Sequence, residues 1–185
     1  MNISWVLADN LVLDPLADLR QMKNIGSMWG SWRTWRACST DNVICHDSAK
    51  AQELVAKDFH KTCNFYISNA AFPAGSVPAG ARLYEGSFVD DVVESDEIVA
   101  LHLAASTSDI VLLLGFNWQQ PRETGDKAQD RRNQVYGILV RNAIRDNPQV
   151  QWVLVDHIGP VMSEIAKLDN LTQDSMATAL SLLNS

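Results

Sequence analysis

Polar side chains that could do chemistry follow apolar runs at five points along this sequence. These residues are Asp9 and Asn10, His46 and Asp47, Ser68 and Asn69, Gly115 to Trp118, and Asp156 and His157. If the five runs are strands of one parallel sheet, their carboxyl ends share an edge. Ligands of open α/β sheets bind beyond that edge. We therefore expect carboxylates, histidines and amides to converge there.

Asp9 and Asp156 are the two residues that we predict to be catalytic. A polar residue after a strand often caps the next helix, and Asp47 suits that role because an expected helix follows it directly. After Asp9 and Asp156 the next expected helix begins several residues later, so capping explains them less well. A partly buried carboxyl group can serve as an acid or base near neutral pH. A reaction at a glycosidic or phosphoester bond would suit such groups.

The histidine–aspartate neighbours raise the question of a metal. His46, Asp47 and His157 are weak candidate ligands, because adjacent residues of a strand point to opposite faces and neither pair can be assumed to share an ion. The sequence contains no H-x-H or H-E-x-x-H spacing. It predicts no definite cofactor. A divalent metal is kept as an alternative that requires His46 and His157 to approach each other.

The segment GSMWGSWRTWR, residues 26–36, is the most unusual stretch of the chain. On a helix, its tryptophans would form one stripe packed on a sheet, with Arg33 beside Trp29 and Arg36 beside Trp32. Alternatively, the segment begins as a loop and Ser31 caps a helix that starts at Trp32. The helix N-terminus and the arginines could then bind an anion.

The second interpretation defines a candidate ligand site, although the spacing matches neither common phosphate-binding glycine motif. Its predicted ligand-binding residues are Gly26, Ser27, Gly30, Ser31, Arg33 and Arg36, together with Asn117 and Trp118 from a later strand end. A small anionic ligand is the expected partner.

Apolar runs alternate with helical patterns along most of the chain. The expected strands are NISWVLAD, DNVICHD, CNFYIS, DIVLLLGF and VQWVLVDH. Helices are expected from Asp14 to about residue 25, over 48–61, after Ser95, over 126–146, from Gly159-Pro160, and after a cap at Thr172. This order predicts a single α/β domain over residues 1–185, a three-layer sandwich with a mostly parallel, Rossmann-like sheet of about five strands flanked by helices.

An irregular stretch at about residues 69–95 interrupts this rhythm. It contains prolines and glycines and one short strand signal at 82–85. A long insertion of this kind is either a binding loop that closes over a ligand or a plain surface excursion.

Composition excludes several classes of protein. The 185 residues are 46% apolar and carry a net charge of −7, which makes general nucleic-acid binding unfavourable. The three cysteines lack metal-binding spacing, no signal-peptide pattern is present, and the longest apolar run, 110–116, is too short to cross a membrane. We expect a soluble, cytoplasmic protein with no membrane partner.

Three functions are compatible with these patterns. The first is binding of a nucleotide, nucleoside or other phosphorylated ligand at the carboxyl edge of the sheet, with or without bond cleavage. The second is a non-enzymatic interaction or structural protein that uses exposed tryptophans to contact a protein partner or a second copy of itself. The third is a metal-dependent hydrolase.

Overall fold

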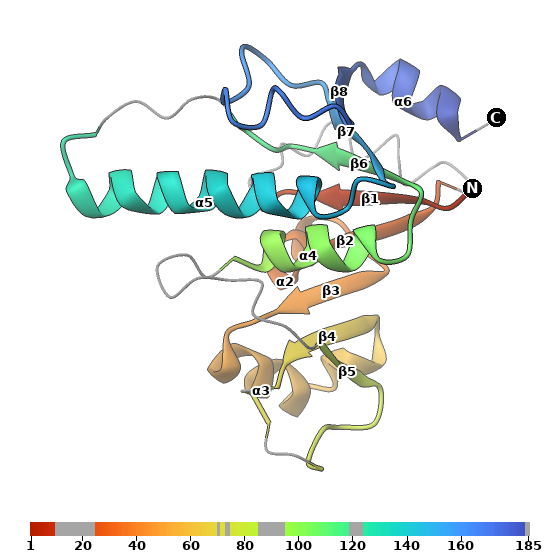
Figure 1. Ribbon diagram of the computed structural model, residues 1–185. Coiled ribbons are helices and arrows are strands. Elements are labelled where there is room, and N and C mark those ends of the chain that lie inside the picture. Colours follow the sequence, from red (N-terminus) through yellow and green to blue (C-terminus); the bar gives the residue numbers. More distant parts are fainter. Residues whose placement is uncertain (10–24, 70, 73–74, 85–94, 119–123, 184–185) are drawn as a thin grey trace.

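The computed structural model describes residues 1–9, 25–69, 71–72, 75–84, 95–118 and 124–183. Its centre is a single sheet of eight parallel strands in the order β5-β4-β3-β2-β1-β6-β7-β8 (Figure 1). The strands are β1 (Ile3–Leu7), β2 (Ser27–Ser31), β3 (Asn42–Cys45), β4 (Asn64–Ser68), β5 (Ala81–Tyr84), β6 (Ile110–Leu114), β7 (Gln151–Val155) and β8 (Leu171–Asp174).

The predicted α/β architecture with a parallel sheet is confirmed, but the sheet has eight strands rather than about five. The helices among the described residues are α2 (Trp32–Ala37), α3 (Ser48–Ala56), α4 (Asp96–Ala105), α5 (Lys127–Arg145) and α6 (Met176–Leu182), with a 3₁₀ turn at Phe59–Lys61. None of them is both long and apolar enough to span a membrane.

The central strands are apolar because helices cover both faces of the sheet. All five residues of β6, IVLLL, are buried, and both neighbours of this strand run parallel to it. A strand buried on both faces reads as a continuous apolar run rather than as an alternating one. The continuous apolar run that predicted this strand therefore results from its position in the centre of the sheet.

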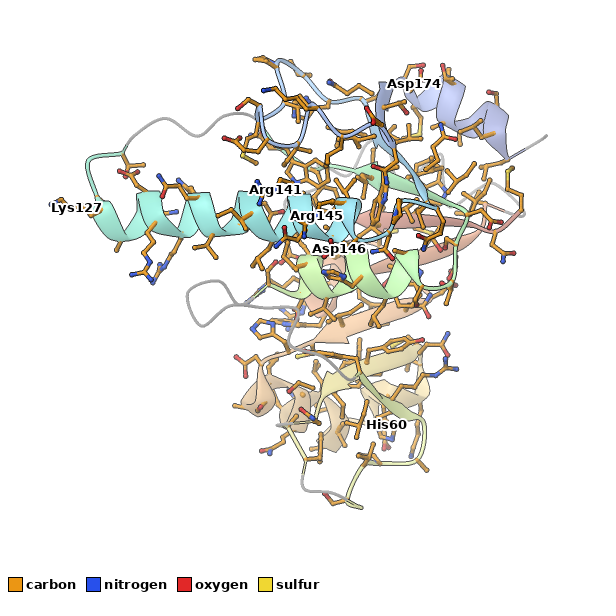
Figure 2. All side chains as sticks on the ribbon, viewed as in Figure 1. His60, Lys127, Arg141, Arg145, Asp146 and Asp174 are labelled. Carbon is orange, nitrogen blue, oxygen red and sulfur yellow. The ribbon has the colours of Figure 1, made fainter. Side chains whose placement is uncertain are left out.

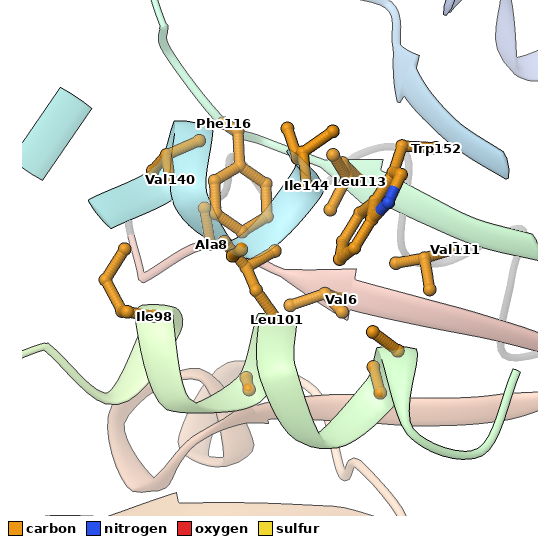
Figure 3. Packing of buried hydrophobic residues seen from close by; sticks show 14 of the residues in the cluster. Val6, Ala8, Ile98, Leu101, Val111, Leu113, Phe116, Val140, Ile144 and Trp152 are labelled. Carbon is orange, nitrogen blue, oxygen red and sulfur yellow. The ribbon is translucent and has the colours of Figure 1, made fainter. Parts of the chain in front are cut away.

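Helices α4 and α5 cover one face of the sheet. Figure 3 shows Ile98 and Leu101 of α4 and Val140 and Ile144 of α5 facing side chains of β1, β6 and β7, with Trp152 among them. Helix α6 contributes to a smaller apolar cluster on the opposite face of β1, β6 and β7, and α3 contributes to another around β3 and β4. The result is a packed core in which α4 lies over β1, β2 and β3.

Several local expectations need correction. The last helix begins at Met176 with Ser175 as its cap, not after Thr172, because residues 171–174 form the exposed edge strand β8. Gly159-Pro160 is followed by turns at residues 163–167, where a short helix was expected. Almost all of the helix expected from Asp14 to about residue 25 lies outside the described residues, as do Asn10 and residues 70, 73–74 and 85–94 of the 69–95 insertion.

The order of the strands reverses at β1. Strands β2 to β5 extend from one side of β1, and β6 to β8 extend from the other. Open α/β sheets of this Rossmann type bind ligands beyond the carboxyl ends of the strands at such a switch point. The residues that follow β1 and β6 therefore lie where a ligand would be expected to bind.

Candidate functional site

Asp9 lies at the switch point, two residues after the end of β1. The hydroxyl groups of Ser31 and Thr34 both donate hydrogen bonds to its Oδ1 atom, Thr34 from 3.0 Å. The Nη1 atom of Arg33 lies 3.4 Å from its Oδ2 atom. The Asp9 side chain is 24% exposed. Its carboxylate is thus held from one side and still reaches solvent.

Ser31 is the residue that fixes this arrangement. As predicted, it is the N-cap of α2, and its Oγ atom accepts hydrogen bonds from the backbone amides of Arg33 and Thr34 at 3.0 and 3.1 Å. The same hydroxyl donates to Asp9. Because Ser31 already occupies two amides at the start of α2, this helix end offers less to an anion than the sequence suggested.

Glu97, the second residue of α4, faces the same point. Its Oε1 atom accepts a hydrogen bond of 2.8 Å from the backbone amide of Asp9, and its Oε2 atom accepts one of 3.0 Å from the hydroxyl of Tyr136. The indole nitrogen of Trp118 lies 3.5 Å from that hydroxyl. Residues that are distant in sequence are therefore joined in one chain of hydrogen bonds, the switch-point cluster of Asp9, Glu97, Trp118 and Tyr136.

Burial raises the pKa of Glu97, and the negative charge of Asp9 adds to this effect. The hydrogen bonds from the Asp9 amide and the Tyr136 hydroxyl oppose it without cancelling it. Two neighbouring carboxyl groups in unlike surroundings are the usual arrangement for an acid and a base that act together. Glu97 is the group held toward its protonated form.

The raised pKa predicts how Glu97 affects stability. A carboxyl group whose pKa is higher in the folded than in the unfolded protein binds its proton more tightly when folded, so stability falls as the pH rises through that range. We expect Glu97→Gln to have a larger free energy of unfolding than the wild type at neutral pH. This gain should vanish in urea titrations below the ordinary glutamate pKa of 4.5.

Glu53→Gln is the matched control, because Lys50 and Lys57 lower the pKa of Glu53 to about 2. The free energy of unfolding of Glu53→Gln should be lower than that of the wild type at neutral pH. The difference should be small because the residue is exposed. A gain in Glu97→Gln that persisted at low pH would show that charge burial is not its cause.

A histidine–aspartate pair lies two strands from β1, at the carboxyl end of β3. The backbone amide and the Nδ1 atom of His46 are each 2.8 Å from Oδ1 of Asp96, whose side chain is buried. A carboxylate in this position fixes the orientation of the imidazole. Burial raises the pKa of neighbouring Cys45 to about 12, so its thiol is neutral near pH 7.

Three cations surround the indole of Trp32. The guanidinium carbons of Arg33 and Arg36 each lie 5.0 Å from its ring centre, and the Lys50 ammonium lies 4.6 Å away. The predicted contact between Arg36 and Trp32 is confirmed. Arg33 also stacks on Trp32 and not on Trp29, because Trp29 belongs to β2 and its buried indole donates to Ser4.

The segment 26–36 does not form one site, because β2 carries it across the sheet. Gly26 and Ser27 lie at the amino edge, and Ser31 lies at the carboxyl edge, roughly 13 Å away for four strand residues. The Ser27 hydroxyl accepts a hydrogen bond of 2.6 Å from Asn42. The prediction that Gly26 and Ser27 bind ligand together with Ser31 and Arg33 is therefore wrong.

Gly30 has a packing role within the same strand. A Cβ atom at this position would lie 3.1 Å from the Cβ atom of Thr34. The absent side chain lets the first turn of α2 fold back onto β2 and place Thr34 against Asp9.

Asp156 and its neighbours lie apart from Asp9. Two strand spacings, about 10 Å, separate the ends of β1 and β7. The Oδ1 atom of Asp156 accepts a hydrogen bond of 2.9 Å from the amide of Met176, at the start of α6. Asp156 thus anchors a helix, and it does not share the surroundings of Asp9. Of the two later candidates, Asn117 is exposed, whereas Trp118 is fully buried.

The structure does not bring the candidate metal ligands together. His46 follows β3 and His157 follows β7, four strand spacings or about 19 Å apart, so they cannot share an ion. Asp47 caps α3 by accepting a hydrogen bond from the amide of Lys50. Across the described ranges, no group of three or more His, Cys, Asp or Glu side chains is arranged to hold a metal.

The sheet places this chain among the open, parallel α/β proteins. A search of known protein families, of curated proteins and of solved structures found no match to it.

Proposed function

We propose that the protein binds a nucleoside- or nucleotide-like ligand at the switch point and acts on its glycosidic bond. The observation that carries this proposal is the pairing of Asp9 with Glu97 through the amide of Asp9, at the place where the strand order reverses. The pair consists of the Asp9 carboxylate, which reaches solvent, and the buried Glu97 carboxyl group, whose pKa is raised.

The polar groups around Asp9 suit a sugar. Carboxylate and hydroxyl oxygens accept hydrogen bonds from sugar hydroxyl groups, and the hydroxyls of Ser31 and Thr34 lie beside the Asp9 carboxylate. The carboxyl groups of Asp9, Asp96 and Glu97 are close enough that Asp9 and Asp96 both raise the pKa of Glu97. Three neighbouring carboxyl groups would repel the negative charge of a phosphoester. We therefore favour the glycosidic bond as the bond that reacts.

The two carboxyl groups would divide the work of cleavage. Glu97 would donate its proton to the leaving base, because burial favours its protonated form. Asp9 would stabilise the positive charge that develops on the sugar or activate the attacking water. Tyr136 would position Glu97 through its hydroxyl.

A negatively charged substituent of the ligand would meet the cations around Trp32. Arg33 links the two regions, since it contacts both the Asp9 carboxylate and the Trp32 ring. Arg36 and Lys50 complete the basic group. Guanidinium groups bind phosphate by paired hydrogen bonds. A nucleoside monophosphate would therefore use both regions.

The alternative of an interaction protein depended on exposed tryptophans. All six tryptophans are described: Trp5, Trp29, Trp118 and Trp152 are buried, and Trp32 and Trp35 are half-buried. Trp35 packs edge-on against Phe59, with 4.7 Å between the ring centres. The feature that favoured this alternative is therefore missing.

Thermal unfolding against a panel of nucleosides, nucleoside monophosphates and sugar phosphates tests the proposal. A ligand at one hundred times its dissociation constant should add about 2.7 kcal/mol of stability. The stabilisation should be lost in Asp9→Asn and kept in Asp169→Asn, which changes an exposed carboxylate just before β8. Equal stabilisation of both variants, or none of the wild type by any compound, would overturn the proposal.

A further inference from the structure

A hollow lies between α5 and the turn that follows β7. Its volume is about 380 Å³, within the range of small-molecule sites. Figure 2 shows Arg141 on α5, near the loop that follows β7. The hollow is lined by Asn133, Gln134, Gly137, Ile138, Arg141, Met162 and Glu164.

Two opposite charges line this hollow without neutralising each other. No ion pair joins Arg141 to Glu164 or to any other residue in the described ranges, so their charged groups are more than 4.0 Å apart. The Nε atom of Arg141 is buried and has no hydrogen-bond partner in the same part of the chain. A guanidinium that lines a hollow and has no ion-pair partner can pair with the carboxylate of a ligand.

The remaining walls are partly apolar and partly amide. Ile138 is 46% exposed, although it is a large apolar residue, and Met162 is buried beside it. A Cβ atom at Gly137 would lie 3.2 Å from the sulfur of Met162, so the glycine gives this wall its depth. Asn133 accepts a hydrogen bond from Gln129 through its Oδ1 atom, which leaves its amide nitrogen available as a donor.

We infer that this hollow binds a free α-amino acid with an apolar side chain. The ligand carboxylate would pair with Arg141 and receive a further hydrogen bond from Asn133. Its ammonium group would pair with Glu164, and its side chain would cover Ile138 and Met162. A zwitterion would satisfy the cation and the anion of the hollow together. This site is separate from the switch-point cluster, because the Tyr136 side chain joins that cluster from a different face of α5.

Isothermal titration calorimetry with L-leucine tests the inference. We expect a dissociation constant of about 1 mM or tighter. N-acetyl-L-leucine, which lacks the ammonium group, and isoamylamine, which lacks the carboxylate, should each bind about tenfold more weakly or worse. Arg141→Gln and Glu164→Gln should each weaken L-leucine binding by a similar factor.

Two controls keep the result specific. Arg132→Gln removes an exposed charge from the same helix away from the hollow, and Asp9→Asn changes the switch-point cluster, so both should bind L-leucine as the wild type does. Melting curves of all variants would show that they are folded. Absence of binding at about ten times the expected dissociation constant, or equal affinity for N-acetyl-L-leucine, would overturn the inference.

Discussion

Asp9→Asn is expected to lower the rate of glycosidic-bond cleavage by about 10²- to 10⁴-fold, the usual contribution of a positioned acid or base. Asparagine keeps a carbonyl oxygen that can accept from Ser31 and Thr34, so the local structure should survive. It lacks the negative charge that would stabilise the sugar cation or activate water. Release of free base from the nucleotide that stabilises the protein most, followed by chromatography, measures this rate.

Glu97→Gln should cause a loss of the same order, because glutamine cannot supply the proton that the proposed mechanism assigns to Glu97. The double variant should be only slightly slower than either single variant, since residues that act as a unit do not contribute additively. Asp169→Asn is the matched control and should retain the full rate. If the Asp9 and Glu97 losses simply multiplied, the two residues would not form one catalytic pair.

Gly26→Ala is expected to cost about 3–5 kcal/mol of folding stability, although Gly26 contacts no part of the proposed site. Two effects combine here. The backbone of Gly26 has a φ angle of +88°, which side chains disfavour, and an added Cβ atom would lie only 2.2 Å from the carbonyl oxygen of Ile3. That oxygen belongs to β1, so relief of the clash would disturb the pairing of β1 with β2.

Gly125→Ala separates the two effects. Gly125 has a φ angle of +79° but no neighbouring atom within 4 Å of an added Cβ. This variant should lose only about 1 kcal/mol from backbone strain. Urea unfolding of both variants measures the difference. Equal losses would mean that the close approach of Gly26 to β1 has no energetic consequence.

The central strands could be predicted from the sequence because strands that are buried on both faces consist almost entirely of apolar residues. The runs VLLL and WVL contain only large apolar side chains. Asp47 and Ser95, which precede two of the helices, are residue types that favour helix N-caps. Strand β8, with the sequence LTQD, is an exposed edge and carries no apolar period. Strand β2 was missed because SMWGS mixes small, polar and aromatic residues that also fit a loop or a helix.

The residues that meet at the candidate site could be predicted only in part, because a single sequence does not show which strands are neighbours. Asp9, Ser31 and Arg33 were identified from their positions after apolar runs and at a helix start. In the sequence, Glu97 is one of several acidic residues near a helix N-terminus, and Tyr136 is part of a polar helix. Their roles depend on the pairing of β1 with β6 and on how α4 and α5 pack over it. No local spacing encodes that arrangement.

The most direct test of the central claim locates the ligand on the protein. An ¹⁵N-labelled sample would be titrated with nucleoside monophosphates and followed by two-dimensional NMR. We predict that the largest shifts occur at the amides of Ala8, Asp9, Arg33, Thr34 and Gly115, around the carboxyl ends of β1, β2 and β6. Shifts confined to the amino edge of the sheet, or no shifts with any of these compounds, would contradict the proposed site.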